Sequence, residues 1–324
     1  MAADAASALG LRMDGALADL AVDLTRPPLS YRPAAIFDPA EASEFAVERA
    51  DRYADSFPMM QAAVDMASVG LFDQSGPLMA RTFEEIEQAR RRSYHPGHTA
   101  AVRMGTDHSD WRKVFLYTRD HHHAARYTYG MSQRFDDPLE ASKVQRLTFP
   151  LAYDRFVWEQ ARDKDLDPYM VLALMRQESV YDPNAISRVG ARGAMQIMPR
   201  TGHRIADLTA DIDYTAADLE DPIAAIGYGV TYLARLMDRF DHVYPLAIAS
   251  YNGGPHNVSA WLAGTTSDMP MDAFVEHIPF RETRGYVQSV SAHYAAYLDL
   301  YAPEGTHLSI PAQPAGDHPE VVDF

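Results

Sequence analysis

Proline and glycine divide this chain of 324 residues into helix-length segments, and few of the segments alternate polar and apolar residues as strands do. The pattern predicts helices over about 41–56, 58–69, 77–92, 109–129, 137–147, 222–240 and 280–301. In the segment 222–240, for example, the apolar residues Ile223, Ile226, Val230, Leu233, Leu236 and Phe240 recur at helical spacing. The fold is therefore expected to be mainly α, with at most a small sheet.

The length of the chain suits two folding units. Residues 1–40 contain Pro27, Pro28, Pro33 and Pro39, which predict an irregular lead-in. Residues 41–147 read as successive helices with short connections, which indicates a helical region like part of a superhelix. Residues 303–324 are expected to form a C-terminal tail. Within the second half, Asp167-Pro168 and Asp221-Pro222 each place a capping oxygen before a proline, so a helix is expected to begin at each pair.

Composition excludes several classes of protein. Acidic residues outnumber basic ones by 45 to 29, which gives a formal charge of −16 and argues against a surface that binds nucleic acid. No stretch approaches the ~18–20 consecutive apolar residues of a membrane span. The first 24 residues carry four aspartates and no basic start, so no signal peptide is visible. The absence of cysteine excludes disulfides, a thiol nucleophile and iron–sulfur ligation.

One acid interrupts an apolar helical face. Val171, Leu174 and Met175 lie seven, four and three residues before Glu178, so this carboxyl continues the stripe that should face the core. Either Glu178 points to water from a fraying helix end, or it is buried. Burial and the negative end of the helix dipole both raise the pKa of a carboxyl. An acid still protonated near neutral pH suits the protonation of a glycosidic oxygen.

Four motifs follow in order over about 150 residues. They are "RQES" with Ser187 nine residues after Glu178, "GARGAMQIMPRT", "SYNGGP" at 250–255 and "VEHIPFRETRGYVQSV" at 275–290. Together they resemble the soluble lytic murein transglycosylases of the Slt type. The resemblance covers residues 148–302 and implies a lysozyme-like α+β catalytic domain there. This chain departs from the family's usual pattern at Ala194, at Ser250 and at Gly253.

The resemblance also implies an activity and a set of site residues. It implies cleavage of the β-1,4 bond between N-acetylmuramic acid and N-acetylglucosamine without water, which leaves 1,6-anhydro ends. The resemblance then implies that the chain binds peptidoglycan strands and needs no cofactor or metal. It also implies that the reaction takes place in the periplasm or otherwise outside the cytoplasmic membrane. Glu178 is expected to be the sole catalytic acid and base. The positions that match the family's cleft are Ser187, Gln196, Met198, Tyr251, Asn252 and Glu276, and Tyr251 is expected to hold the acid through its hydroxyl.

Several alternatives stay open at this point. Glu276 either stabilises positive charge or orients the cleft, or it pairs with Arg281 or Arg284. At most two of the aromatic residues Tyr228, Tyr232, Trp261 and Phe280 are expected to stack on sugar, because most helical aromatics belong to the core. A hydrolase on the same fold and a non-catalytic glycan-binding scaffold are the alternative functions. Protein partners cannot be named from the sequence.

Three consecutive histidines, His121, His122 and His123, invite a metal interpretation. Side chains of consecutive helical residues point about 100° apart, so three of them cannot readily share one ion. The sequence therefore predicts a solvated helix face here, with no metal bound.

Overall fold

The computed structural model describes residues 39–93, 108–129, 136, 138–266, 269–303 and 305–314. Within these ranges the chain divides into two compact units. One contains residues 39–150 together with 180–184, and the other contains 151–179 together with 185–314. The predicted lead-in at 1–40 lies outside the described residues, apart from Pro39 and Ala40, which begin a helix.

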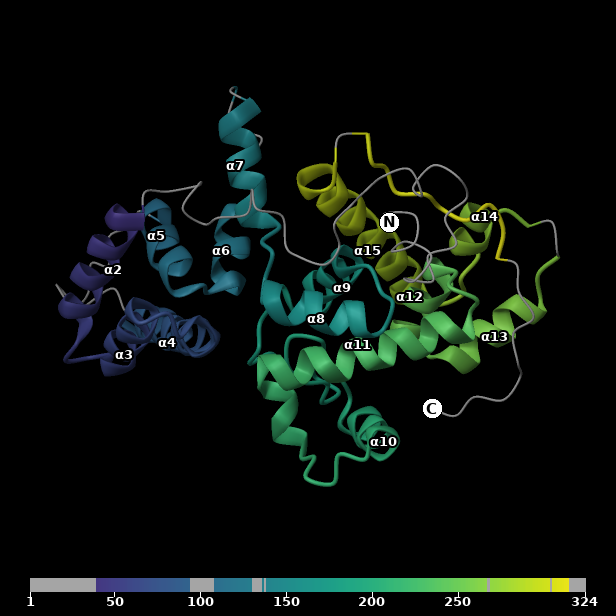
Figure 1. The fold of residues 1–324 in the computed structure, drawn as a ribbon, viewed down its shortest axis with the longest axis horizontal. Helices are drawn as coiled ribbons and strands as arrows, with labels where there is room; N and C mark the ends of the chain where they lie inside the picture. Colours follow the sequence, from purple (N-terminus) through teal and green to yellow (C-terminus); the bar gives the residue numbers. More distant parts are fainter. Residues whose placement is uncertain are drawn as a thin grey trace. The chain divides into compact units, whose positions relative to one another are not determined.

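The first unit is built from helices. They are α2 (Pro39–Tyr53), α3 (Pro58–Ser68), α4 (Phe72–Ser93), α5 (His108–Thr118), α6 (His121–Thr128) and α7 (Pro138–Thr148). Helices α2 to α5 pack on one another, and α6 packs on both α5 and α7 (Figure 1). Aromatic rings fill the centre, where Phe83 lies 4.9 Å from Trp111 and 4.8 Å from Phe115 between ring centroids. This aromatic core holds α4 against α5.

The prediction of one helix over 109–129 is wrong, because the chain forms α5 and α6 instead. Arg119 adopts a left-handed backbone conformation with φ 56°, which ends α5. Asp120 then starts α6 as its N-cap, since its Oδ1 accepts a hydrogen bond of 3.1 Å from the backbone N–H of His123. A local cap has therefore overridden a continuous helical pattern.

The second unit is also helical. It contains α8 (Asp154–Asp163), α9 (Pro168–Ser179), α10 (Pro199–Thr209), the 3₁₀ helix η3 (Ala216–Glu220), α11 (Pro222–Arg239), α12 (Tyr244–Gly253), α13 (Pro255–Ala263), α14 (Met271–Glu276) and α15 (Arg281–Tyr301). The two predicted helix starts are confirmed. Asp167 accepts from the N–H of Tyr169 at 2.8 Å, and Asp221 accepts from the N–H groups of Ile223 and Ala224 at 3.0 and 2.9 Å.

Helix α9 is the centre of this unit. Every residue from Pro168 to Arg176 is buried, and the helix packs along α15 and against α8 (Figure 1). A helix that is apolar on all sides is stable only when other elements surround it. Truncation of a side chain such as Leu172 or Leu174 to alanine removes about 2–5 kcal/mol in cores of this kind. The position of the last turn of α9 is thus set by packing along its whole length.

The expectation of a mainly α fold is confirmed. The small β element is limited, within the described residues, to two isolated antiparallel bridges in the loop between α9 and α10, Ile186 with Arg192 and Arg192 with Ile197. We call residues 185–197 the bridge loop. After α15, the described part of the predicted tail is tied to α14 by a hydrogen bond of 3.0 Å from the N–H of Met271 to the carbonyl of Ala312.

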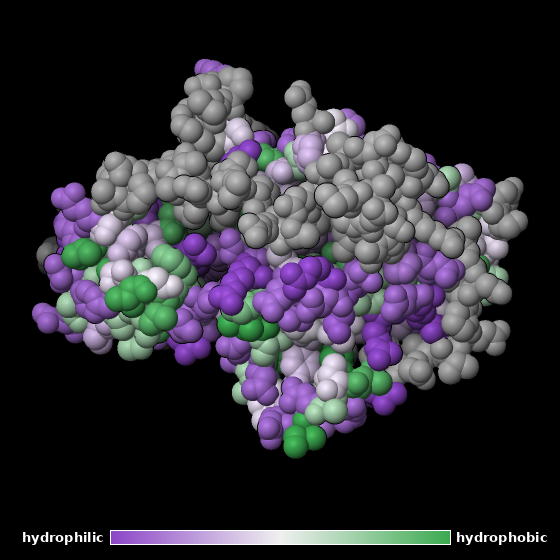
Figure 2. Space-filling view, in the orientation of Figure 1, coloured by the Kyte–Doolittle hydropathy of each residue, from purple (hydrophilic) through white to green (hydrophobic). Residues whose placement is uncertain are grey.

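One face of the molecule is largely polar among its described residues (Figure 2). On the face drawn in Figure 2, hydrophilic residues predominate among those coloured, and apolar residues lie in small separate groups. In the part of the chain that the structure describes, no helix has both the length and the apolarity needed to cross a membrane.

Replacement of Gly193 by alanine is expected to destabilise the second unit by about 3 kcal/mol or more. Gly193 has φ +73°, and a Cβ there would lie 1.7 Å from the backbone oxygen of Leu219, so the bridge loop would have to move. Gly190 is the matched control, because it has φ +92° but open space around it. Gly190→Ala should cost only about 1–2 kcal/mol. Urea unfolding measures both, and equal losses would contradict the steric account.

Candidate functional site

Glu178 lies where the buried helix α9 reaches partial exposure. The nine residues before Gln177 are buried, whereas Gln177, Glu178 and Ser179 are half-buried. The hydroxyl of Ser179 donates to the carbonyl of Ala194 at 2.8 Å and so ties the helix end to the bridge loop. Glu178 is therefore held on a rigid element and does not fray into water.

The acid has one direct partner. The hydroxyl of Tyr286, on α15, donates a hydrogen bond to Oε1 of Glu178, and Tyr286 is itself buried. Among the described residues, Oε2 of Glu178 has no hydrogen-bond partner. One carboxyl oxygen is thus occupied by the protein and the other is available to a ligand.

Electrostatics keep this carboxyl protonated near neutral pH. Burial raises the pKa of Glu178 to about 8, the hydrogen bond from Tyr286 acts in the lowering direction, and the carboxylate of Glu282 raises the pKa further. Glu282 is an exposed residue in the first turn of α15. The prediction of a raised pKa from burial is confirmed, and the alternative of a fully solvated side chain is wrong.

Tyr251 does not hold the acid directly. Its hydroxyl donates to the carbonyl of Met195 at 2.9 Å, which fixes α12 to the bridge loop. The charge of Glu178 nevertheless acts on Tyr251: burial first, and then that charge, raise the pKa of Tyr251 well above its usual value. Its ring lies 5.1 Å from that of Tyr232. Tyr286 is therefore the direct partner of the acid, and Tyr251, with Tyr232 packed on its ring, is a second tyrosine on which the Glu178 charge acts.

Gln196 lies in the bridge loop, next in the chain to Met195, whose carbonyl accepts the hydrogen bond from Tyr251. Gln196 adopts φ 48°, and its side-chain amide donates to the carbonyls of Ala185 at 3.1 Å and Gly193 at 2.9 Å. These bonds use the NH₂ group and leave the amide oxygen for another partner. Ser187 serves the same loop, because its hydroxyl accepts from the N–H of Ala191 at 2.9 Å. Gln196 and Ser187 thus both stabilise the backbone of the bridge loop through side-chain hydrogen bonds.

Met198 and Asn252, two further predicted site residues, lie at the start of α10 and near the end of α12. Met198, 39% exposed, occupies the N-cap position of α10. Asn252 accepts a hydrogen bond of 2.6 Å from the hydroxyl of Thr283 and so links α12 to α15. The departure at Gly253 has a steric reason, since a Cβ there would lie 3.0–3.2 Å from Thr283 and Trp261.

Glu276 is not part of the cluster around Glu178. It is exposed at the end of α14, its Oε1 accepts a hydrogen bond of 2.7 Å from Gln288, and its backbone carbonyl accepts one of 2.8 Å from Arg284. Among the described residues its carboxylate forms no ion pair with an arginine. It lines a cavity of about 420 Å³ whose lining does not include Glu178.

The four aromatic candidates for sugar stacking separate into two pairs. Tyr228 and Tyr232 are each 8% exposed and belong to the core. Phe280 is 48% exposed and packs edge-on against the half-buried Trp261, with centroids 5.2 Å apart. Only this second pair offers aromatic surface to a glycan.

Sequence reasoning missed Tyr286 and Glu282, the two residues that act on the pKa of Glu178. Both lie inside the quoted segment 275–290, and Tyr286 continues the buried face of α15 with Val290, Tyr294 and Tyr297. That helical spacing was the available signal. It marks Tyr286 as buried, and a buried phenol needs a hydrogen-bond partner.

Comparison with known proteins supports the resemblance to soluble lytic murein transglycosylases for the part of the chain that contains Glu178. Residues 156–270 match the family model described as the Transglycosylase SLT domain. The soluble lytic murein transglycosylase of Salmonella typhimurium strain LT2 is 34% identical over 200 residues, which cover 59% of this chain and 31% of that protein. That of Escherichia coli K12 is 34% identical over 192 residues, which cover 57% and 30%. The chain spans about a third of the length of these curated relatives.

One solved structure supports the likeness in fold. A complex of the 70-kDa soluble lytic transglycosylase with bulgecin A has a TM-score of 0.50 and 23% identity, covering 84% of this chain and 48% of that one. The 70-kDa enzyme from Escherichia coli has a TM-score of 0.49 and 26% identity, covering 74% and 39%. The resemblance to soluble lytic murein transglycosylases is confirmed, and residues 156–270 of this chain match the SLT domain of that family.

Proposed function

We propose that this chain is a peptidoglycan lytic transglycosylase that cleaves the β-1,4 bond between N-acetylmuramic acid and N-acetylglucosamine. The observation that carries the proposal is a single carboxyl, Glu178, with a pKa of about 8. One of its oxygens is bonded to Tyr286, and the other has no partner among the residues that the structure describes. The relatives named above act on murein according to their names. Peptidoglycan lies outside the cytoplasmic membrane, and the chain is proposed to act there.

In the proposed reaction, Glu178 first donates its proton from Oε2 to the bridging oxygen as the bond to C1 breaks. The substrate's own 2-acetamido group stabilises the positive charge at C1. The Glu178 carboxylate then takes the proton of the C6 hydroxyl, whose oxygen bonds to C1 and closes the 1,6-anhydro ring. One residue thus serves as acid and then base, the proton count balances, and no water is consumed.

The surroundings of Glu178 suit both halves of this cycle. Burial favours the protonated acid at the start, and the hydroxyl of Tyr286 stabilises the carboxylate once the proton has left. Gln196, Ser187, Met198, Tyr251 and Asn252 are proposed to line the glycan site. The exposed pair Trp261 and Phe280 is proposed to stack on sugar. Glu276 bonds to Gln288 and lines a cavity whose lining does not include Glu178, so it is proposed to act away from the scissile bond.

Glu178→Gln should reduce turnover of purified sacculi by about 10²–10⁴-fold, because the amide donates no proton. Glycan binding should persist, because the side chain keeps its size. Mass spectrometry of the products identifies the reaction: the unaltered chain should release 1,6-anhydro ends. Reducing ends would show hydrolysis by water, and no products would show a glycan-binding scaffold. Either of these two results, or normal activity of the variant, contradicts the proposal.

Activity of the unaltered chain should fall as the pH rises through about 8, because the protonated form of Glu178 is then lost. Tyr286→Phe removes the bond that stabilises the carboxylate, so it should move this fall to higher pH and reduce turnover by about 10- to 100-fold. Tyr294→Phe is the matched control, because Tyr294 is a buried tyrosine on the same helix that donates to Asp167 at 2.5 Å. A shift of the pH profile in the control as large as in Tyr286→Phe would contradict this role.

Glu178→Gln should also stabilise the fold in a pH-dependent way. The pKa of the unfolded residue is near 4.5 and that of the folded residue about 8, so the carboxyl costs stability as the pH rises between these values. The variant should match the unaltered chain below pH 4 and exceed it by about 1–3 kcal/mol at pH 8, because partial exposure of Glu178 weakens the full effect. Denaturant unfolding at both pH values measures this, and a constant difference would contradict a raised pKa.

A further inference from the structure

The three histidines that the sequence assigned to a solvated helix face are buried. His121, His122 and His123 are 9, 6 and 2% exposed, so that prediction is wrong. The reason is that α6 begins at Asp120 and turns its first residues toward α4 and α5 of the first unit. The ring of His123 packs edge-on against Phe83, with centroids 4.8 Å apart, and lies 5.2 Å from the ring of Phe115.

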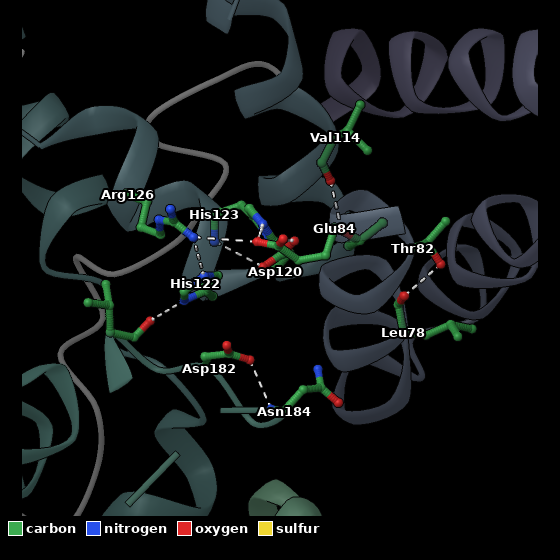
Figure 3. A network of polar contacts seen from close by, with 12 residues as sticks. Leu78, Thr82, Glu84, Val114, Asp120, His122, His123, Arg126, Asp182 and Asn184 are labelled. Atoms are coloured by element: carbon green, nitrogen blue, oxygen red, sulfur yellow. Dashed lines mark hydrogen bonds and ion pairs between the residues drawn. The ribbon is translucent and has the colours of Figure 1, made fainter. Parts of the chain in front are cut away.

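Two of these histidines converge with an acid. His122, His123 and Glu84, which comes from α4, each direct one nitrogen or oxygen to a common place, and the three atoms lie within 4.8 Å of one another (Figure 3). Nε2 of His123 is 3.4 Å from Oε1 of Glu84. Two ligands of a tetrahedral zinc ion are separated by ~3.3 Å, given bonds of about 2.0–2.1 Å. The spacing already fits one edge of such a site.

The other ring nitrogens fix which tautomer is present. Nδ1 of His122 lies 3.0 Å from the backbone carbonyl of Val180, and Nδ1 of His123 lies 2.8 Å from Oδ2 of Asp120. A carbonyl and a carboxylate only accept, so both Nδ1 atoms carry hydrogen. In the neutral rings both Nε2 lone pairs therefore point into the cluster. Metal-binding histidines are usually held in this way, by a carboxylate or carbonyl on the far nitrogen.

A positive charge is needed inside this cluster. The lone pair of His123 Nε2 faces an anionic oxygen of Glu84 at 3.4 Å, which is repulsive unless a proton or a metal ion lies between them. Arg126 supplies part of the charge, because its Nη1 lies 3.4 Å from Oε1 of Glu84 and 3.2 Å from Nε2 of His122. The guanidinium thus occupies the side of the cluster where an ion would bind. The side chain of Arg126 is 52% exposed, so the guanidinium can move into solvent when an ion binds.

We propose that Glu84, His122 and His123 bind one divalent transition-metal ion of the zinc class, with Arg126 displaced to solvent and water at the remaining position. Glu84 supplies a carboxylate oxygen and each histidine supplies Nε2, a ligand set typical of zinc. Asp120 accepts a hydrogen bond from Nδ1 of His123, which orients the ring, and also caps α6, so ion binding and the start of that helix are linked. The ion would fasten α6 to α4, independently of any reaction at Glu178.

The test is calorimetric titration of the full, untagged chain with Zn²⁺. One ion per chain is expected, with a higher melting temperature when it is bound. Glu84→Gln keeps the side-chain size at a half-exposed position and should weaken binding at least tenfold. Glu85→Gln changes the exposed neighbour on the same helix and should leave binding unchanged. No binding, or binding equally strong in Glu84→Gln, would overturn the proposal in favour of a proton shared by His123 and Glu84.

Two further variants separate ligation from simple folding effects. Arg126→Ala removes the competing cation and should tighten Zn²⁺ binding severalfold, whereas a residue with a merely structural role would not have this effect. Asp120→Asn retains a good helix cap but loses the charge that orients His123, so it should weaken binding about 10- to 100-fold. Visible absorption of the Co²⁺ form reports four-coordinate geometry directly. Unchanged affinity in both variants would refute the site even if zinc binds elsewhere.

Discussion

The desolvation of one carboxyl at the end of a fully buried helix is the constraint on which the candidate site depends. Nine successive residues of α9 lie in the core, so the direction of the helix and the place where it emerges are fixed by packing. Glu178 follows two residues later and has a pKa of about 8 because burial disfavours its charged form. The apolar stripe that precedes the acid is therefore the cause of its chemistry and of its position.

The chemical type of the residue that bonds to Glu178 is equally important. An arginine or lysine beside Glu178 would lower its pKa by about 1–3 units and would remove the proton that the first step requires. A tyrosine hydroxyl has no charge. Burial, and then the charge of Glu178 with smaller effects of Tyr251 and Tyr232, raise the pKa of Tyr286 well above its usual value. Tyr286 therefore remains a neutral donor at working pH. It can stabilise the carboxylate without preventing protonation, which suits a residue that must exchange its proton twice in a cycle.

Local signals in the sequence were sufficient for some features and not for others. The helix starts at Asp167 and Asp221 and the interruption of the α9 face by Glu178 depend on neighbours within a few residues, so they were predictable. Tyr286 contacts Glu178 across 108 residues, and no periodicity shows which of several tyrosines will reach the acid. The prediction of a solvated face for the three histidines was wrong for a similar reason, because their burial depends on contacts of α6 with two other helices, α4 and α5. The break at Arg119, in contrast, depends on a local cap formed by Asp120, which the continuous helical pattern concealed.

The turn that follows the acid shows how the first unit offsets a strained backbone. Val180 and Tyr181 have φ of 54° and 62°, a left-handed conformation that costs about 1–2 kcal/mol per residue and is rarer still for a β-branched side chain. Residues 180–184 belong to the first unit, where the carbonyl of Val180 accepts from Nδ1 of His122 and Asn184 accepts from Arg81 at 2.9 Å. A metal ion on Nε2 of His122 would make its Nδ1–H a stronger donor to Val180. The proposed ion would therefore stabilise the strained turn that begins two residues after Glu178 in the chain.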